Sequence, residues 1–152
     1  MPTPSASSHT IRLHRVLLAP PERVYRAFLD PRAKCKWLPP HGFVAEMHKC
    51  DPRVGGSYHM SFINFNTGQA HTFGGTYVEL IPNQLIRYTD RFDDPNLPGE
   101  MHITITLRSV SCGTDLTIVQ EGVPAVIPPE SCYAGWQQSL HLLAHIVEPA
   151  IP

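Results

Sequence analysis

Six segments between residues 42 and 121 have the patterns of strands, two of them with regular alternation of apolar and polar side chains, and the connections between them are short. In the clearest one, residues 101–107, Met101, Ile103 and Leu107 belong to one alternating set, and His102 and Thr104 belong to the other. A period of two is typical of a strand with one buried face. Strands joined by short turns pair antiparallel, because a parallel pair needs a crossover of about a dozen or more residues. The pattern therefore predicts an antiparallel sheet.

The expected elements follow one another in a simple order. Strands are expected over residues 10–18, 42–49, 57–64, 70–81, 85–92, 101–107 and 115–121, one or two short helices over residues 20–37, and a long helix over residues 129–148. Gly55 and Gly56 supply the turn before the third strand. An open sheet with one apolar face must bury that face against another layer, and only the last helix is long enough to cover it. The predicted fold class is α+β.

Length and charge limit the kinds of partner. The 152 residues fit one domain over residues 10–152, preceded by a disordered tail over residues 1–9. Lys and Arg number 12 against 13 Asp and Glu, and neither sign forms a long run. Nucleic acid and anionic membranes need a concentrated basic surface, so neither is expected as a partner. No apolar stretch approaches the roughly 18 residues of a membrane span, and no signal peptide is evident. We expect a cytoplasmic protein.

The four cysteines are expected to be free thiols. Cys35, Cys50, Cys112 and Cys132 form no CxxC pair and occur in a chain without export features. Cys132 lies in the first turn of the last helix, where a thiol can become a nucleophile. It also falls on the apolar stripe of that helix beside Trp136, and no neighbouring base is evident. A small apolar filler is the favoured interpretation.

The histidines offer acid, base and metal chemistry, but their positions favour ordinary surface roles. His141 and His145 have the spacing at which two imidazoles on one helix can share a metal ion. On a helical wheel they lie opposite the stripe formed by Trp136, Leu140, Leu143, Val147 and Cys132. We expect no metal site there and no cofactor. His59 and His102 fall on the polar sets of their strands, which should face outward.

Several segments together resemble one known family. "WLPP...GF", "DPRVGGSY", "GTYVELIPNQLIRYTDRF", "CGTDL" and "GWQQSLHLLAHIVE" occur in order and look like the activator-of-heat-shock-protein-90-ATPase-like branch of the START-like (SRPBCC) superfamily. The resemblance covers residues 10–150. It implies a helix-grip fold, in which a curved antiparallel sheet of six to seven strands wraps the long C-terminal helix and leaves a cavity. Superfamily relatives bind lipids, steroids, plant hormones or polyketides, and some cyclise or dehydrate polyketides. No family catalytic constellation maps onto this chain.

Aromatic and apolar residues of the sheet and the last helix are the candidates for the wall of that cavity. The expected cavity residues are Trp37, Phe43, Tyr58, Met60, Phe62, Phe73, Tyr77, Arg91, Trp136 and Leu140. Tyr and Trp side chains would each present a polar tip to a ligand. Residues 85–92 carry Arg87, Asp90 and Arg91, and their inward set brings either Arg91 or Asp90 with it. An inward arginine would select an anionic ligand, whereas cross-strand ion pairs on a solvated face are the alternative.

Three functions remain open at this stage. The first is a binding protein, monomeric or homodimeric, for a small apolar or aromatic molecule, with no catalytic residue. The second is a cyclase, dehydratase or hydrolase acting on an aromatic or polyketide-like substrate, which would need at least two polar groups converging in the cavity. The third is a chaperone-interacting module, which would need an exposed apolar patch instead. The sequence favours the first.

Overall fold

A computed structural model describes residues 8–152 of the chain. The element order matches the sequence prediction, with one strand, two short helices, six strands and a final helix. The elements are β1 (Ser8–Leu17), α1 (Pro21–Leu29), α2 (Pro31–Trp37), β2 (Phe43–Cys50), β3 (Ser57–Asn64), β4 (Ala70–Ile81), β5 (Leu85–Phe92), β6 (Met101–Val110), β7 (Gly113–Pro124) and α3 (Pro129–Val147). Gly55, expected in a turn, has a positive φ of 84° between β2 and β3.

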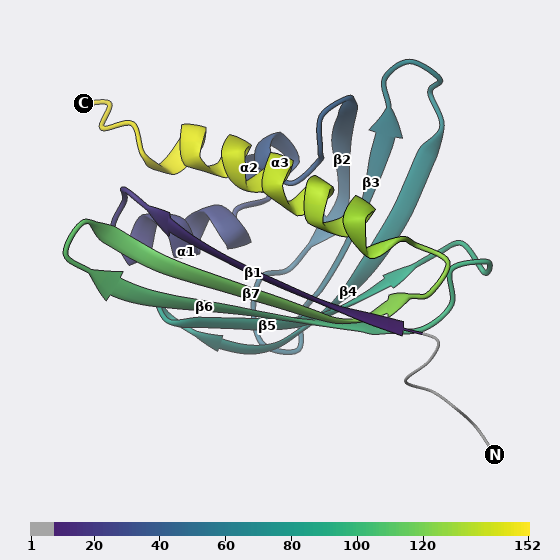
Figure 1. Ribbon diagram of the computed structural model, residues 1–152, viewed down its shortest axis with the longest axis horizontal. Coiled ribbons are helices and arrows are strands. Elements are labelled where there is room, and N and C mark those ends of the chain that lie inside the picture. Colours follow the sequence, from purple (N-terminus) through teal and green to yellow (C-terminus); the bar gives the residue numbers. More distant parts are fainter. Residues whose placement is uncertain (1–7) are drawn as a thin grey trace.

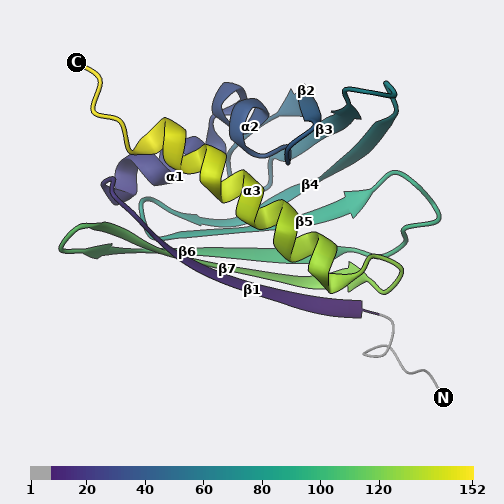
Figure 2. The same ribbon diagram turned by 45° about the horizontal axis from the view of Figure 1, so that its top comes forward.

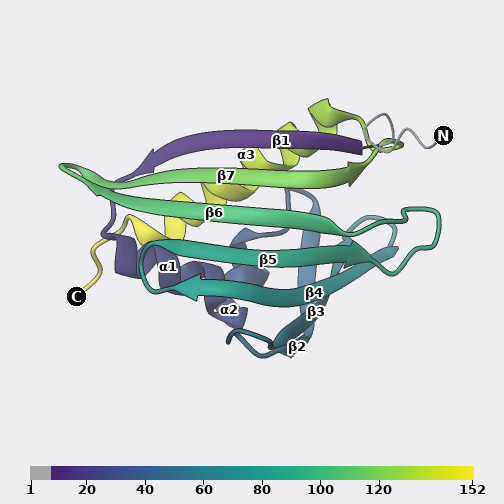
Figure 3. The same cartoon turned by 90° about the horizontal axis from the view of Figure 1, so that it is seen from below.

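One antiparallel sheet contains all seven strands in the order β1-β7-β6-β5-β4-β3-β2. Consecutive strands β2 to β7 pair as hairpins, and the first strand returns to lie beside the last. Figure 3 shows this order from the side opposite the helices, with β1 and β7 at one edge and β2 at the other. The predicted meander is confirmed.

The three helices lie on one face of the sheet. Figures 1 and 2 show α3 crossing this face, with α1 and α2 beside its C-terminal half. The sheet curves so that β2 and β3 rise beside α2 and α3 (Figure 1). This is the helix-grip arrangement, and the predicted α+β class is confirmed. Within residues 8–152, no helix combines the length and the apolar character that crossing a membrane requires.

The alternating patterns place the core between the sheet and the helices. In β6, Met101, Ile103, Ile105 and Leu107 are all buried, as the alternation predicts. On α3, the apolar-stripe residues Leu140, Leu143 and Val147 are buried, whereas His141 and His145 are exposed. The wheel prediction for the two histidines is therefore confirmed.

The structure changes one boundary of the predicted domain organisation. Ser8 and His9, which were expected within the tail of residues 1–9, belong to β1, because they pair with Pro124 and Val123 of β7. The rest of that tail, residues 1–7, lies outside the described part of the chain.

Candidate functional site

A cavity of about 410 Å³ lies between the sheet and α3. Its walls are mostly apolar, and its polar side chains include Lys34 and Asp90. The volume lies in the range of small-molecule sites, roughly 300–1,000 Å³. Binding sites of that kind combine apolar walls with a few placed polar groups. The cavity therefore has the size and the lining of a ligand site.

Lys34 reaches the cavity from α2, and local interactions fix that helix. The Asp30 carboxylate caps its first turn by accepting hydrogen bonds from the backbone amides of Arg32 (2.8 Å) and Ala33 (3.2 Å). Trp37 is fully buried and donates its indole N–H to the Ala27 carbonyl at 2.9 Å. Lys34 lies three residues before Trp37, so both side chains share the buried face of the helix.

Three tyrosines from neighbouring strands surround the Lys34 amine. This tyrosine cluster consists of Tyr58 on β3, Tyr77 on β4 and Tyr88 on β5, with ring centroids 5.7–6.2 Å apart. Lys34 Nζ lies 4.5 Å from the centroid of the Tyr58 ring and 3.5 Å from the Tyr77 hydroxyl oxygen. Among the described residues, no carboxylate lies within ion-pair distance of Lys34. Burial lowers the pKa of Lys34, although the nearby Cys50 and Asp90 act in the opposite direction.

Asp90 presents a carboxyl group to the same cavity. Its Oδ1 is out of reach of solvent, and among residues 8–152 no group hydrogen bonds to it. Burial raises the pKa of Asp90 to about 7, against opposing effects of the Tyr58 hydroxyl and the Lys34 charge. The single Tyr58 hydroxyl proton is directed to the Thr89 carbonyl oxygen at 3.2 Å. Asp90 thus has hydrogen-bonding capacity that the protein itself leaves unused.

An aromatic wall forms another part of the cavity. It consists of Phe43, Phe62, Phe73 and Phe92 from the sheet, together with Trp136 from α3. The Phe62 and Phe73 rings meet edge to face, with centroids 4.8 Å apart. Trp136 donates its indole N–H to Gln120 Oε1 on β7 at 2.8 Å, which fixes the ring against the sheet. The cavity therefore combines ionisable groups with a set of flat aromatic surfaces.

One face of α3 completes the cavity. The residues that line it from successive turns are Ser131, Cys132, Gly135, Trp136 and Ser139. The Ser139 hydroxyl donates to the Leu38 carbonyl at 2.6 Å, so the helix is tied to the end of α2 at this point. Gly135 has no side chain, and a Cβ built there meets no atom within 4 Å. Part of the cavity volume is therefore the space that a larger residue at position 135 would occupy.

The structure brings five of the ten expected cavity residues to the lining and places the others elsewhere. Phe43, Tyr58, Phe62, Phe73 and Trp136 line the cavity. Trp37 packs edge to face on Phe28 of α1, at 4.8 Å between ring centroids. Met60 is fully buried in the core, and Leu140 faces the groove beside β1. Tyr77 belongs to the tyrosine cluster, where its hydroxyl oxygen accepts a hydrogen bond from Lys34 Nζ, and it is not part of the cavity lining.

Arg91 lies outside the cavity, which corrects its place in the predicted set. Its side chain is 64% exposed and lies 3.9 Å from Glu100. The inward residues of β5 are Ile86, Tyr88 and Asp90, which pair with the inward residues Ile105, Ile103 and Met101 of β6. The strand therefore turns Asp90 inward and Arg91 to the solvated side. No arginine lines this cavity among the described residues.

Lys34 and Tyr88 were not predicted as cavity residues, although the sequence carries a signal for each. In residues 85–92, the alternating set of Ile86, Tyr88 and Phe92 is the apolar one, and it includes Asp90. A charged residue within an apolar set is the unusual feature that marks the site. In α2, the spacing from Trp37 puts Lys34 on the buried face.

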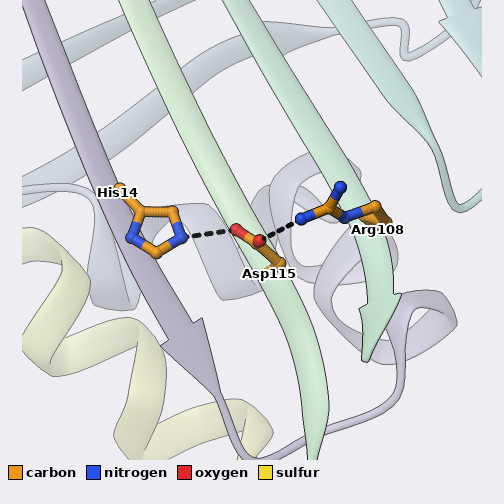
Figure 4. A network of polar contacts seen from close by, with 3 residues as sticks. All are labelled: His14, Arg108 and Asp115. Carbon is orange, nitrogen blue, oxygen red and sulfur yellow. Dashed lines mark hydrogen bonds and ion pairs between the residues drawn. The ribbon is translucent and has the colours of Figure 1, made fainter. Parts of the chain in front are cut away.

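The outer face of the sheet holds a separate polar network. Asp115 on β7 accepts hydrogen bonds from His14 on β1 (2.6 Å) and Arg108 on β6 (2.8 Å), as Figure 4 shows. His14 and Arg108 are mostly exposed. His59 and His102 also lie on this side, as predicted, and pair with Asp93 and Glu100. These polar contacts lie on a solvated face, apart from the cavity under α3.

The remaining candidate groups show no reactive arrangement. All four cysteines are free. Cys132 is partly buried against the core, and burial raises the pKa of its thiol, which disfavours the nucleophilic thiolate. Within residues 8–152, no three His, Cys, Asp or Glu side chains gather in a way that could hold a metal ion.

Comparison with known proteins agrees with this architecture. The family described as Activator of Hsp90 ATPase homolog 1-like protein matches residues 18–148. The crystal structure of protein CV1439 from Chromobacterium violaceum is 67% identical, with a TM-score of 0.91, over 92% of this chain and 97% of that chain. Protein NE0264 from Nitrosomonas europaea is 21% identical, with a TM-score of 0.77, over 97% of this chain and 98% of that one. A Rhodobacter sphaeroides protein is 18% identical, with a TM-score of 0.79, over 92% and 91%. Comparison with curated proteins returned no match.

Proposed function

The chain belongs to the family of Activator of Hsp90 ATPase homolog 1-like proteins, within the START-like superfamily, and we propose that it binds a small aromatic molecule in the cavity under α3. The observation that carries this proposal is the composition of the lining. Aromatic side chains make up much of the lining, and Lys34 and Asp90 add two ionisable groups to the same cavity. A matching ligand has either a single aromatic ring or two fused aromatic rings, and it carries a polar group at one end.

Each part of the lining has a separate task in this proposal. The aromatic wall supplies most of the binding free energy by removing the ligand rings from water and by edge-to-face contacts. The two ionisable groups set the orientation. Lys34 donates a hydrogen bond to an oxygen of the ligand. Asp90 accepts a hydrogen bond from the ligand when its carboxyl group is ionised and donates one when it is protonated. Four free cysteines fit the reducing cytoplasm, which we propose as the compartment.

Filling the cavity from α3 tests this proposal. In Gly135→Leu the new side chain projects into the open volume beside Trp136 and excludes the ligand. Ala134→Leu is the matched control, because Ala134 is the adjacent residue of the same helix and is exposed. The probe is 2-naphthol, a fused aromatic with one hydroxyl group, and binding is measured by isothermal titration calorimetry.

We expect 2-naphthol to bind the unmodified protein and Ala134→Leu with equal affinity. Gly135→Leu should weaken binding by about tenfold or more, since a steric clash of 1.4 kcal/mol already has this effect. The far-ultraviolet circular dichroism of all three proteins should agree. Equal binding to Gly135→Leu would refute the proposed site, and no binding to any of the three would refute the ligand class.

A further inference from the structure

We infer that Lys34 forms a reversible imine with an aromatic aldehyde or ketone that enters the cavity, and that Asp90 is the proton donor for this reaction. The inference rests on the proposed function, because the carbonyl compound must first bind against the aromatic wall. It goes further by assigning covalent chemistry to Lys34 and Asp90.

The surroundings of the Lys34 amine are suited to a nucleophile. The side chain is 3% exposed and lines a cavity large enough for a fused aromatic ring. Its neighbours are tyrosine rings and the Tyr77 hydroxyl, so no carboxylate holds the amine as an ion pair in the described structure. Desolvation in an apolar pocket is one of the established ways in which a protein activates a lysine, because it favours the neutral amine. The lowered pKa of Lys34 agrees with this geometry.

Asp90 supplies the acid that imine formation needs. Its buried Oδ1 has no partner, and its carboxyl group faces the same cavity from β5. A pKa raised to about 7 keeps a fraction of this group protonated near neutral pH. The titratable groups around the Lys34 amine are Cys35 on α2, Cys50 on β2, Tyr58 on β3, Tyr77 on β4, and Tyr88 and Asp90 on β5. Among these groups, Asp90 is the carboxylic acid.

The reaction balances with the groups present. The neutral Lys34 amine attacks the carbonyl carbon, and one of its protons passes to the carbonyl oxygen to give a carbinolamine. Asp90 then protonates the carbinolamine hydroxyl, the carbon–oxygen bond breaks, and water leaves. The iminium nitrogen returns its proton to the Asp90 carboxylate, which ends in the protonated form in which it began. The net change is an amine plus a carbonyl compound giving an imine plus water, with no oxidant or reductant.

Reductive trapping provides a direct test, because the chain has few competing amines. Its lysines are Lys34, Lys36 and Lys49. Lys36 is exposed on the same helix and is the matched control. The protein is incubated with 2-naphthaldehyde, reduced with sodium borohydride, digested and mapped by mass spectrometry. Borohydride converts an imine to a stable secondary amine. In a parallel incubation with 2-naphthol, which has no carbonyl group, no adduct should form.

We expect at least about tenfold more adduct on Lys34 than on Lys36, because a carbonyl group held beside the amine has a high effective concentration. Lys34→Arg should lose this adduct, and Lys36→Arg should retain it. The peptide map of the unmodified protein decides the question even where Lys34→Arg does not fold.

The two proposals fail in different ways. Equal labelling of Lys34, Lys36 and Lys49, or no Lys34 adduct in protein that binds both 2-naphthol and 2-naphthaldehyde, overturns the imine and leaves the binding function intact. Failure of both compounds to bind in calorimetry overturns the binding function and the imine together.

Discussion

Asp90 lines the cavity with its Oδ1 shielded from solvent, and its ionisation should appear in the stability of the protein. Its pKa is about 7 in the folded chain, against an ordinary value of 3.8. Between these values the folded state binds one proton more than the unfolded state, so the contribution of Asp90 to the free energy of unfolding falls as pH rises. The contribution is complete below the ordinary value and is lost once the pH has passed the folded value.

Asp90→Asn removes this titration. The free energy of unfolding of the variant, minus that of the unmodified protein, should therefore increase with pH from about 4 to about 7 and then level off. Urea unfolding followed by circular dichroism at several pH values measures this difference. Asp94→Asn, in the exposed loop after β5, is measured in parallel as the control for losing one carboxylate. If the free energies of unfolding of Asp90→Asn and of the unmodified protein changed with pH in parallel, the raised pKa assigned to Asp90 would be contradicted.

Asp115 should show the opposite sign. A hydrogen bond from Arg108, and to a smaller extent one from His14, lowers the pKa of Asp115 below the ordinary value of 3.8. Its stabilising contribution is present above that value and is lost as the pH falls through the lower folded value. Asp115→Asn should therefore be less stable than the unmodified protein at neutral pH, and the difference should vanish in strong acid. Added salt should shrink the difference at neutral pH, because the group is on a solvated face. A salt-independent difference would argue against an electrostatic origin.

Sequence reasoning found the aromatic half of the site but missed most of the polar half. Phe62 and Phe73 lie on alternating apolar sets, so their inward direction follows from period alone. Lys34 was not predicted because a lysine is ordinarily expected at the surface. In the structure, its position on the buried face of α2 places it in the interior all the same. Asp90 and Arg91 remained alternatives until pairing of Asp90 with Met101 fixed the direction of the strand. Burial of a charge depends on neighbours from other elements, and local pattern does not contain them.

Strand β4 depends on a residue without a side chain where it passes β5. A Cβ added at Gly75 would lie 1.8 Å from the Thr89 carbonyl oxygen, which also accepts the Tyr58 hydroxyl. Neither the Thr89 carbonyl oxygen, in the backbone of β5, nor the Tyr58 hydroxyl, at the cavity, can move freely to make room for the added Cβ. The close approach of the two strands therefore requires glycine at this position.

Gly75→Ala should destabilise the protein by about 2 kcal/mol, the middle of the range for forced overpacking. Val78→Ala, an exposed position of the same strand, should change the free energy of unfolding by less than about 0.5 kcal/mol. Urea unfolding of the two variants gives both values. Equal stability of Gly75→Ala and the unmodified protein would show that β4 can move away from β5 at little cost.

The elements themselves were largely predictable because each has its own local signal. The alternation in β3 and β6, the prolines opening α1 and α2, and the apolar stripe of α3 all act within a few residues. The start of β1 was misjudged at Ser8 and His9, since these residues join the sheet by pairing with β7, more than a hundred residues along the chain. Such pairing leaves no local pattern.

The whole molecule combines a curved sheet with one long helix and two short ones on the same face, and this shape leaves a cavity between the layers. An empty apolar cavity loses dispersion contacts along its wall and costs stability. A molecule that occupies the cavity restores those contacts. Since only the folded chain has the cavity, binding must raise the free energy of unfolding by mass action.

2-Naphthol at about one hundred times its dissociation constant should stabilise the protein by about 2.7 kcal/mol. For a chain of this length, that gain corresponds to a rise of about 5–10 °C in the unfolding temperature. In Gly135→Leu the added side chain occupies the same volume, so the rise at the same ligand concentration should be lost, whereas Ala134→Leu should keep it. Differential scanning calorimetry over a series of ligand concentrations measures the effect. An equal rise in all three proteins would mean that 2-naphthol binds outside the cavity, because position 135 blocks only the space beneath α3.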